Sequence, residues 1–199
     1  VQRSRGVAET LSRGIRHLMK KNDITVIEGF ARLEAPGEIS VSVQDDVLTR
    51  VKAEHIIFAT GASSKSIPGM SVDGKVVWSA KEAMTPTALP ASLLVVGSGA
   101  IGIEFASFYR SFGTEVTVIE RLDRILPQED ADVSKAAQTS FQKRGMQFFT
   151  GATLDKLDVN TNDADVTWTD NKGQTHEGQF DRVILAVGVS ANTEGLGLL

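Results

Sequence analysis

Three glycines and one carboxylate have residue types and a spacing that could do chemistry. Gly97, Gly99 and Gly102 occupy the glycine positions of G-x-G-x-x-G, directly after an apolar run of leucine and valine. Glu120 ends a second apolar run, 23 positions after Gly97. In a strand–turn–helix unit the first glycine permits a tight turn, the second lets the backbone approach a pyrophosphate, and the third lets the helix pack closely. The pattern predicts a dinucleotide-binding site.

The residues after these glycines have the pattern of a helix. Four apolar residues are spaced to form one buried face of it: Ile101, Phe105, Phe108 and Phe112. The N-terminus of such a helix offers unpaired N–H groups and a partial positive charge to phosphates. The position of Glu120 is also close to the offset of about 20 residues expected for a ribose-binding acid. The alternative is an ordinary strand–turn–helix in which Glu120 is a solvated strand end.

Glu120 also bears on which nucleotide would bind. A carboxylate at the end of the second strand can accept hydrogen bonds from both ribose hydroxyls, and it repels a 2′-phosphate. Arg121 and Arg124 follow at once and would favour a phosphate instead. Because the carboxylate has the diagnostic position, the sequence favours NAD over NADP.

Composition restricts the class of protein. The 199 residues are 41% hydrophobic and 23% charged, which is ordinary for a globular protein of one or two domains. With a net charge of −4, no surface for nucleic acid or anionic lipid is indicated. No apolar stretch approaches the ~18 residues that a membrane span needs. The start has no initiator Met and no apolar signal core, so we expect an internal position of a longer chain.

Cysteine and histidine usage excludes several kinds of site. The chain has no cysteine, which rules out disulfides, cysteine-based zinc sites and thiol chemistry within these residues. The histidines His17, His55 and His176 show no metal-ligand spacing. We therefore predict no metal site.

The second half of the chain alternates strands and helices. The expected elements are a strand from Leu93, a helix at 100–112, a strand at 116–120, a helix at 131–144, a strand at 147–150, short strands at 154–159, 164–169 and 174–178, and a final strand at 182–187. The final strand is apolar enough to be central in a sheet. Two β-α units, a β-meander and a return strand predict a Rossmann-like α/β domain.

The first half is less regular. We expect a helix at 7–21 that stops at Asn22, and short strands at 24–28, 39–43, 47–51 and 56–59. Asp45-Asp46 suggests a hairpin-type turn before the third of these strands. Residues 60–92 have the composition of a connector, with a short helix at 79–83. We place a domain boundary between residues 85 and 92.

A second signature consists of two strands that each end in glycine. Residues 56–61 and 183–188 share four apolar residues, the last of which is the small residue alanine, followed by one further residue and glycine. A terminal glycine lets the chain pass tightly against a bound ligand. Each stretch alone is also compatible with a plain buried strand, but the two flank the predicted dinucleotide motif.

The order of these motifs resembles that of the flavoprotein reductases with two dinucleotide-binding domains, the pyridine nucleotide-disulfide oxidoreductase family. Within that family the dihydrolipoamide dehydrogenases are most similar. The resemblance runs the whole length of the chain, and residues 93–130 are its most specific part. Further segments that carry it are Leu18-Met-Lys-Lys-Asn22, Lys81-Glu-Ala83, Arg124-Ile-Leu-Pro127 and Glu194-Gly-Leu-Gly-Leu198.

The resemblance implies a division of the chain and a set of cofactor contacts. Residues 1–88 would be part of an FAD-binding domain and residues 89–199 an NAD-binding domain. The implied NAD contacts are Gly97, Ser98, Gly99, Ala100, Ile101, Gly102, Ile103, Glu104, Glu120, Leu154 and Gly188. The implied FAD contacts are Ala31, Thr60, Gly61 and Ala62. Glu104 also has a simpler interpretation, as an acid favoured by the helix dipole in the first turn.

The resemblance further implies what the whole enzyme does. It would be a cytoplasmic homodimer that oxidises dihydrolipoamide on a lipoyl domain and passes electrons through a disulfide and FAD to NAD⁺. The redox cysteines, the first glycine motif and the His–Glu acid/base pair of the family are not in this sequence, so we expect no catalytic residue here. Two alternatives stay open, an NADH-dependent flavoprotein reductase without redox cysteines and a non-catalytic NAD-binding module.

Overall fold

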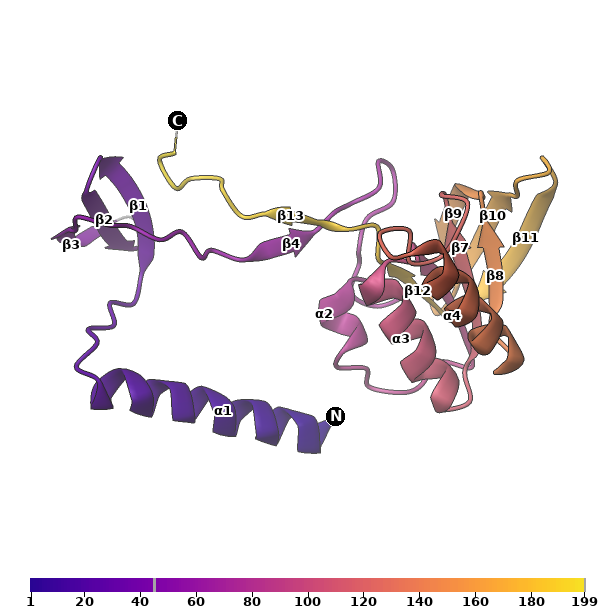
Figure 1. Cartoon of the computed structure of the whole chain (residues 1–199), viewed down its shortest axis with the longest axis horizontal. Coiled ribbons are helices and arrows are strands. Elements are labelled where there is room, and N and C mark those ends of the chain that lie inside the picture. The colour runs from indigo at the N-terminus through magenta and orange to yellow at the C-terminus, as the bar shows by residue number, and fades with distance from the viewer. Residues whose placement is uncertain (45, 199) are drawn as a thin grey trace. The chain divides into compact units, whose positions relative to one another are not determined.

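The computed structural model describes residues 1–44 and 46–198, and the chain divides into two compact units. One unit comprises Val1–Ser63 with Ala191–Leu199, and the other comprises Ser64–Ser190. Figure 1 labels the helices and strands of both.

A five-stranded parallel sheet forms the centre of the unit Ser64–Ser190. Its order is β5-β12-β6-β7-β8, and every neighbouring pair is parallel. The strands are β5 (Val77–Trp78), β6 (Ser92–Val96), β7 (Glu115–Glu120), β8 (Gln147–Thr150) and β12 (Arg182–Leu185). The prediction that the last strand is interior is confirmed, because β12 lies between β5 and β6. The sequence missed β5, which is too short to show a strand pattern.

Each face of this sheet has its own core, because successive strand residues point to opposite sides. Leu94 and Val96 of β6 belong to one buried cluster, which includes Trp168 and Phe180. Leu93 and Val95 belong to the other, which includes residues of α3 (Ala100–Ser111). Burial on both faces explains why β6 is a continuous apolar run.

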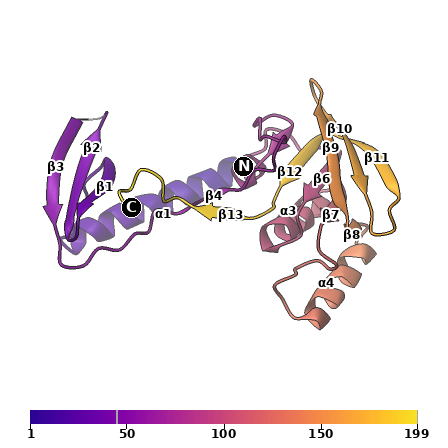
Figure 2. The same cartoon turned by 90° about the horizontal axis from the view of Figure 1, so that it is seen from above.

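Helices cover one face of the sheet and an antiparallel meander covers the other, as Figures 1 and 2 show. The helices are α2 (Ala80–Ala83), α3 and α4 (Ala131–Lys143). The meander consists of β9 (Thr153–Val159), β10 (Ala164–Thr169) and β11 (Thr175–Phe180), in the order β11-β10-β9. All of these elements were predicted to within two residues at each end, and the mixed α/β class with a parallel sheet is confirmed.

The buried face of α3 is not the one that the sequence predicts. The residues that α3 buries are Gly102, Ile103, Ala106 and Tyr109. Of the predicted face only Phe105 packs partly against the core, whereas Ile101, Phe108 and Phe112 are exposed. The prediction was wrong because glycine and alanine at 102 and 106 let the helix axis approach the sheet, and this turns the larger side chains outward.

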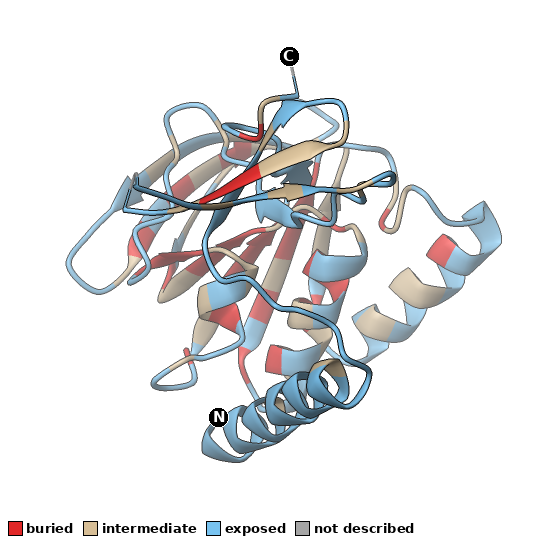
Figure 3. Cartoon of the chain, turned by 90° about the vertical axis from the view of Figure 1, so that its left-hand side faces the viewer, coloured by how far each residue is buried: buried red, intermediate tan, exposed pale blue. Residues whose placement is uncertain are grey.

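The other unit contains α1 (Gln2–Lys21) and an antiparallel sheet of β1 (Phe30–Ala35), β2 (Glu38–Val43) and β3 (Asp46–Lys52). The helix ends at Asn22, as predicted, and none of its residues is buried, which Figure 3 shows. The strands predicted at 39–43 and 47–51 are confirmed as β2 and β3. Asp45 of the predicted turn lies outside the described residues. No helix within residues 1–44 and 46–198 is long and apolar enough to cross a membrane.

Two strands predicted in this unit are wrong. Residues 24–28 and 56–59 are described, and neither stretch forms a strand. None of their apolar side chains is buried: Ile56 is half-buried, the others are exposed, and Ile57 is 90% exposed. A strand needs hydrogen-bonding neighbours, and an apolar run cannot supply them by itself. The sequence also missed β1, which has no β-branched residue.

The chain passes between the units in β4 (Ala62–Ser64) and β13 (Val189–Ala191), which pair with each other. The units therefore divide at other positions than the predicted boundary of 88 and 89. Residues 64–88 group with the parallel sheet because Val77 and Trp78 pair with Val183 and Ile184 of β12. The assignment of the two parts to FAD and NAD stays a prediction.

Candidate functional site

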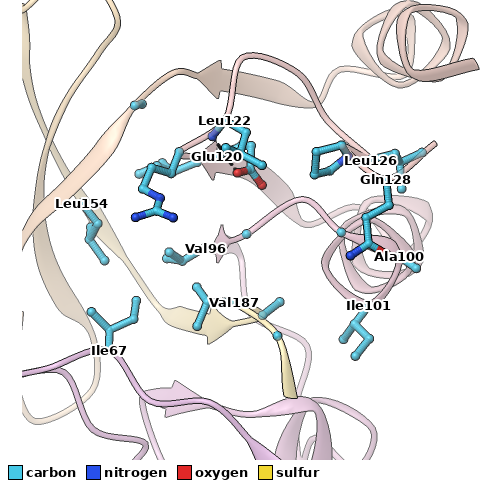
Figure 4. Close-up of a pocket in the computed structure, with 18 of the residues that line it drawn as sticks. Ile67, Val96, Ala100, Ile101, Glu120, Leu122, Leu126, Gln128, Leu154 and Val187 are labelled. Carbon is cyan, nitrogen blue, oxygen red and sulfur yellow. Dashed lines mark hydrogen bonds between the residues drawn. The ribbon is translucent and has the colours of Figure 1, made fainter. Parts of the chain in front are cut away.

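A pocket opens at the carboxyl ends of three neighbouring parallel strands, β6, β7 and β12 (Figure 4). Its volume of about 590 Å³ is in the range of small-molecule sites. Open α/β sheets bind ligands at this edge. Seven of the predicted NAD contacts line it: Gly97, Gly99, Ala100, Ile101, Glu120, Leu154 and Gly188.

Two of the three motif glycines are required by the fold itself. Gly97 has φ +98°, and a Cβ on it would lie 2.5 Å from the carbonyl oxygen of Ala186. A Cβ on Gly102 would collide with the carbonyl oxygen of Gly97. These glycines therefore allow the turn after β6 to pass under β12 and α3 to pack against that turn.

Gly99 differs from the other two, because a Cβ added to it would meet nothing within 4 Å. Its backbone is extended, with φ −65° and ψ −178°, which any residue can adopt. Gly99 is also the N-cap of α3, and no side chain caps the helix there. The first N–H groups of α3 thus lack intrahelical partners and lie beside the pocket, which is the arrangement that binds a phosphate. The space left by Gly99 belongs to the pocket and not to the protein core.

Glu120 brings a nearly buried carboxylate to the wall of the pocket. Its side chain is held from two sides: Oε2 accepts hydrogen bonds from Ser98 N at 2.8 Å and Ser98 Oγ at 2.7 Å, and Oε1 accepts one from Leu122 N at 2.8 Å. Glu120 is 8% exposed, so it is not the solvated strand end of the alternative interpretation. Figure 4 shows it beside Leu122 at the edge of the sheet.

The loop after β7 forms a wall of the pocket that the sequence did not predict. Leu126, Pro127, Gln128 and Glu129 line the pocket. Leu126 has φ +46°, and its N–H donates to the carbonyl oxygen of Ser98 at 2.8 Å. These residues show no strand or helix period, so only their place in the resemblance to known proteins pointed to them.

The opposite wall comes from the end of β12. Gly188 has φ +115°, and its carbonyl oxygen accepts a hydrogen bond from Lys65 N at 2.9 Å. Ala186 and Val187 line the pocket beside it, although the sequence singled out only the glycine. Ile67 and Leu154 add apolar surface, and Figure 4 shows both on the same side as Val187.

Four predicted NAD contacts do not line the pocket. Ser98 and Gly102 are buried beneath it, and Ile103 faces the core. Glu104 is exposed and lines a separate shallow hollow on α3 with Ser107 and Phe108. Glu104 follows the pocket-lining residues Ala100 and Ile101 by about one helical turn, and its predicted contact stays a prediction.

The predicted FAD contacts lie in the other unit. Ala31 is in β1, and Thr60, Gly61 and Ala62 lead into β4; all four are exposed. Asn192 fixes this stretch, because its N–H donates to Gly61 O at 3.0 Å and its carbonyl oxygen accepts from Thr60 Oγ1 at 2.7 Å. Gly61 has φ +75°. The predicted flavin contacts stay a prediction.

Tyr109 anchors α3, the helix whose N-terminal residues line the pocket. It is fully buried on α3, and its hydroxyl donates to Ala83 O at 2.7 Å. Burial raises the pKa of Tyr109 to about 12. The neutral phenol therefore holds α3 against α2 throughout the neutral pH range.

Comparison with known sequences identifies relatives over the whole chain. The sequence model of the family described as pyridine nucleotide-disulphide oxidoreductase matches residues 2–198. The dihydrolipoyl dehydrogenase of Rhizobium etli is 44% identical over 212 aligned positions, which cover 100% of this chain and 44% of that protein. That of Bacillus subtilis is 38% identical and covers 99% of this chain and 44% of the other. The chain spans less than half the length of these relatives.

Comparison with solved structures gives the same grouping. The crystal structure of LpdA from Mycobacterium tuberculosis matches with a TM-score of 0.82 at 31% identity, over 97% of this chain and 42% of that one. The Cu(II) complex of a mutant of the HOCl-induced flavoprotein disulfide reductase RclA from Escherichia coli also matches with a TM-score of 0.82. It is 26% identical, over 98% of this chain and 43% of that one.

Proposed function

The chain belongs to the pyridine nucleotide-disulphide oxidoreductase family, and from this premise we propose that it is the NAD-binding segment of a dihydrolipoyl dehydrogenase. The observation that carries the proposal is the pocket beside Gly99, where an uncapped helix N-terminus faces open space. The relatives named dihydrolipoyl dehydrogenase support the choice of enzyme.

The residues around the pocket fit the parts of NAD. The turn Gly97–Gly99 and the first N–H groups of α3 would hold the pyrophosphate, because they combine close backbone approach with positive potential. Glu120 would accept a hydrogen bond from the adenosine ribose, and Leu154 would pack near the adenine. Ile101 and Gly188 line the pocket at the ends of α3 and β12, and they would lie near the nicotinamide.

The whole protein would oxidise dihydrolipoamide on a lipoyl domain, which loses two electrons and two protons. The electrons would pass through a cysteine disulfide and FAD to NAD⁺, which takes up a hydride while one proton is released. The redox chemistry is supplied by these groups, and this segment binds and orients the acceptor. Residues 89–199 would supply the NAD domain and residues 1–88 part of the FAD domain, with Ala31 and Thr60–Ala62 as the flavin contacts. At the borders, residues 64–88 pack with the sheet of the NAD domain and residues 191–199 group with the first unit. The whole enzyme would act as a homodimer.

Titration of the purified 199-residue chain with NAD and with FAD tests the proposal. We expect saturable NAD binding, measured by calorimetry and by the fluorescence of the two tryptophans. The variant Glu120→Gln should bind NAD more weakly, while the exposed Glu177→Gln should bind as the unchanged chain does. Absence of any NAD binding by a folded chain would contradict the proposal. Binding of FAD alone would favour a flavin-binding fragment of a reductase with another acceptor.

A further inference from the structure

Ser98 forms hydrogen bonds to two other parts of the site, at Glu120 and at Leu126. It is fully buried, and it lies between two glycines of the motif without lining the pocket. Its N–H and its hydroxyl both donate to Glu120 Oε2, at 2.8 and 2.7 Å. Its carbonyl oxygen accepts from Leu126 N at 2.8 Å. One residue therefore joins the glycine turn, the end of β7 and the loop wall of the pocket.

These contacts leave Glu120 with little capacity to bind a ligand. A carboxylate has about four acceptor positions, and Ser98 N, Ser98 Oγ and Leu122 N use three of them. Both positions on Oε2 are taken, whereas Oε1 receives one hydrogen bond. The oxygen that can still meet a ribose hydroxyl is thus Oε1. Ser98 holds Oε2 through its N–H and its hydroxyl, and the hydroxyl is the one of these two donors that a substitution can remove.

Arg121 makes the orientation important for specificity. It follows Glu120 directly and lines the same pocket. A guanidinium attracts a 2′-phosphate, and a fixed carboxylate beside it repels the same group. The nucleotide that binds therefore depends on whether the carboxylate keeps the orientation in which it can accept from a ribose hydroxyl and repel a 2′-phosphate.

We propose that Ser98 is a positioning residue that sets the choice of NAD over NADP by holding the Glu120 carboxylate in one orientation beside Arg121. The inference rests on the proposed NAD site. A second serine supports the arrangement, because the buried Ser134 donates from Oγ to Leu126 O at 3.1 Å and so holds the loop to which Ser98 is bonded.

The test uses the full 199-residue chain and its Ser98→Ala variant, with Ser140→Ala on the exposed surface of α4 as the control. Dissociation constants for NAD, NADP, ADP-ribose and nicotinamide mononucleotide are measured by calorimetry. Without the hydroxyl the carboxylate must be ordered when the ribose binds, at a cost comparable to the lost hydrogen bond, so the dissociation constants for NAD and ADP-ribose should rise about tenfold. The dissociation constant for NADP should fall or stay the same. The NADP-to-NAD ratio of dissociation constants should therefore decrease about tenfold. Nicotinamide mononucleotide should bind unchanged, which a general loss of structure would not allow.

Two further variants separate positioning from folding. In a Glu120→Gln background, Ser98→Ala should no longer change the NADP-to-NAD ratio, because the charge that it orients is gone. Ser98→Cys keeps a similar volume with a much weaker donor, and it replaces the alanine variant if thermal unfolding shows that variant to be misfolded.

The outcomes distinguish the two proposals. An unchanged NADP-to-NAD ratio in a folded Ser98 variant that still binds NAD overturns the role of Ser98 and leaves the NAD site intact. Equally weakened binding of all four ligands also overturns the role of Ser98, because it shows that the substitution disturbs the structure of the whole site. Failure of the unchanged chain to bind either dinucleotide overturns both the site and its positioning residue.

Discussion

The substitutions Gly99→Ala and Gly102→Ala, three residues apart, should have different effects: the first should weaken NAD binding and the second should destabilise the fold. At Gly102 the added methyl group would collide with the carbonyl oxygen of Gly97. That carbonyl cannot move freely, because Gly97 is held on two sides. Its N–H donates a hydrogen bond to Ile119 O at 2.8 Å, and the backbone of Ala186 lies close against its Cα. We expect Gly102→Ala to cost about 3 kcal/mol, the upper end of ordinary overpacking, and to lower Tm by roughly 10 °C.

Gly99→Ala should leave the fold almost unchanged. The new Cβ meets nothing within 4 Å, and φ −65° is accessible to alanine. A small gain from the stiffer unfolded chain and a small loss at the N-cap offset each other, so stability should change by less than about 1 kcal/mol. The methyl group would, however, enter the space where the pyrophosphate approaches the backbone. An overlap worth roughly 1–3 kcal/mol corresponds to a 5- to 150-fold rise in the dissociation constant for NAD.

The assay pairs thermal unfolding by circular dichroism with NAD calorimetry on the same preparations. The control is Gly14→Ala, because Gly14 is exposed on a helix and a Cβ added to it would meet nothing within 4 Å. Gly173 is unsuitable as a control, because its φ of +77° would strain an alanine. The reasoning is refuted if Gly99→Ala binds NAD with unchanged affinity. It is also refuted if Gly102→Ala unfolds at the same temperature as the unchanged chain.

Three further predictions concern titration and activity. Tyr109 is the one tyrosine of the chain, and its pKa is raised by burial to about 12. Its phenolate absorbance should therefore be absent in the folded chain at pH 10. The stability that the neutral phenol contributes should be complete below the unfolded pKa of about 10 and should be lost progressively as pH rises from there to about 12. Tyr109→Phe should remove that alkaline loss. The hydrogen bond from His176, with further ones from the Gln174 and Lys172 N–H groups, lowers the pKa of Asp170 to about 2. The carboxylate should therefore stabilise the meander above pH 4 and lose this effect as pH falls towards 2. Asp170→Asn should lower Tm at neutral pH but not at pH 2. The control Glu177→Gln should leave Tm unchanged at both pH values. Finally, a preparation of these 199 residues, which contain no cysteine, should show no oxidation of dihydrolipoamide with NAD; turnover would contradict the placement of the disulfide outside this segment.

The sequence predicted several residues that line the pocket, but it did not predict the loop wall beside them. Gly97, Gly99 and Glu120 were predicted because a tight turn, a phosphate and a ribose would each demand a particular residue type at a particular offset. The loop wall at Leu126 and Pro127 has no such demand, since it is placed by hydrogen bonds to Ser98 and Ser134 from other elements. Contacts of this kind connect residues far apart in the sequence, and no local pattern reports them.

Helix α3 shows that periodicity identifies a helix more reliably than its buried face. Phenylalanines at 105, 108 and 112 repeat at helical spacing, yet the sheet receives Gly102, Ala106 and Tyr109 instead. The smallest residues of a helix decide where it approaches a sheet most closely, and Gly102 is fixed at that place because it packs against the turn at Gly97. Given that one contact, helical geometry places residues 103, 106 and 109 inside and turns 108 and 112 outward. The motif glycine therefore predicts the face that the apolar pattern missed.

The unit Val1–Ser63 with Ala191–Leu199 shows the opposite limit. Its helix α1 was predicted at 7–21 from the spacing of its apolar residues, and it forms over Gln2–Lys21. Its hydrogen bonds run within the segment itself, so it forms although it buries no residue. The predicted strands at 24–28 and 56–59 have equally apolar sequences but do not form, because a strand takes its hydrogen bonds from neighbouring strands. Ile57, at 90% exposed, indicates the same cause, since an apolar side chain on a central strand would be covered. Where β2 has partners on both sides, in β1 and β3, a run of the same kind does become a strand. The presence of neighbouring strands, and not the apolar pattern, therefore decides which runs in this unit are β-structure.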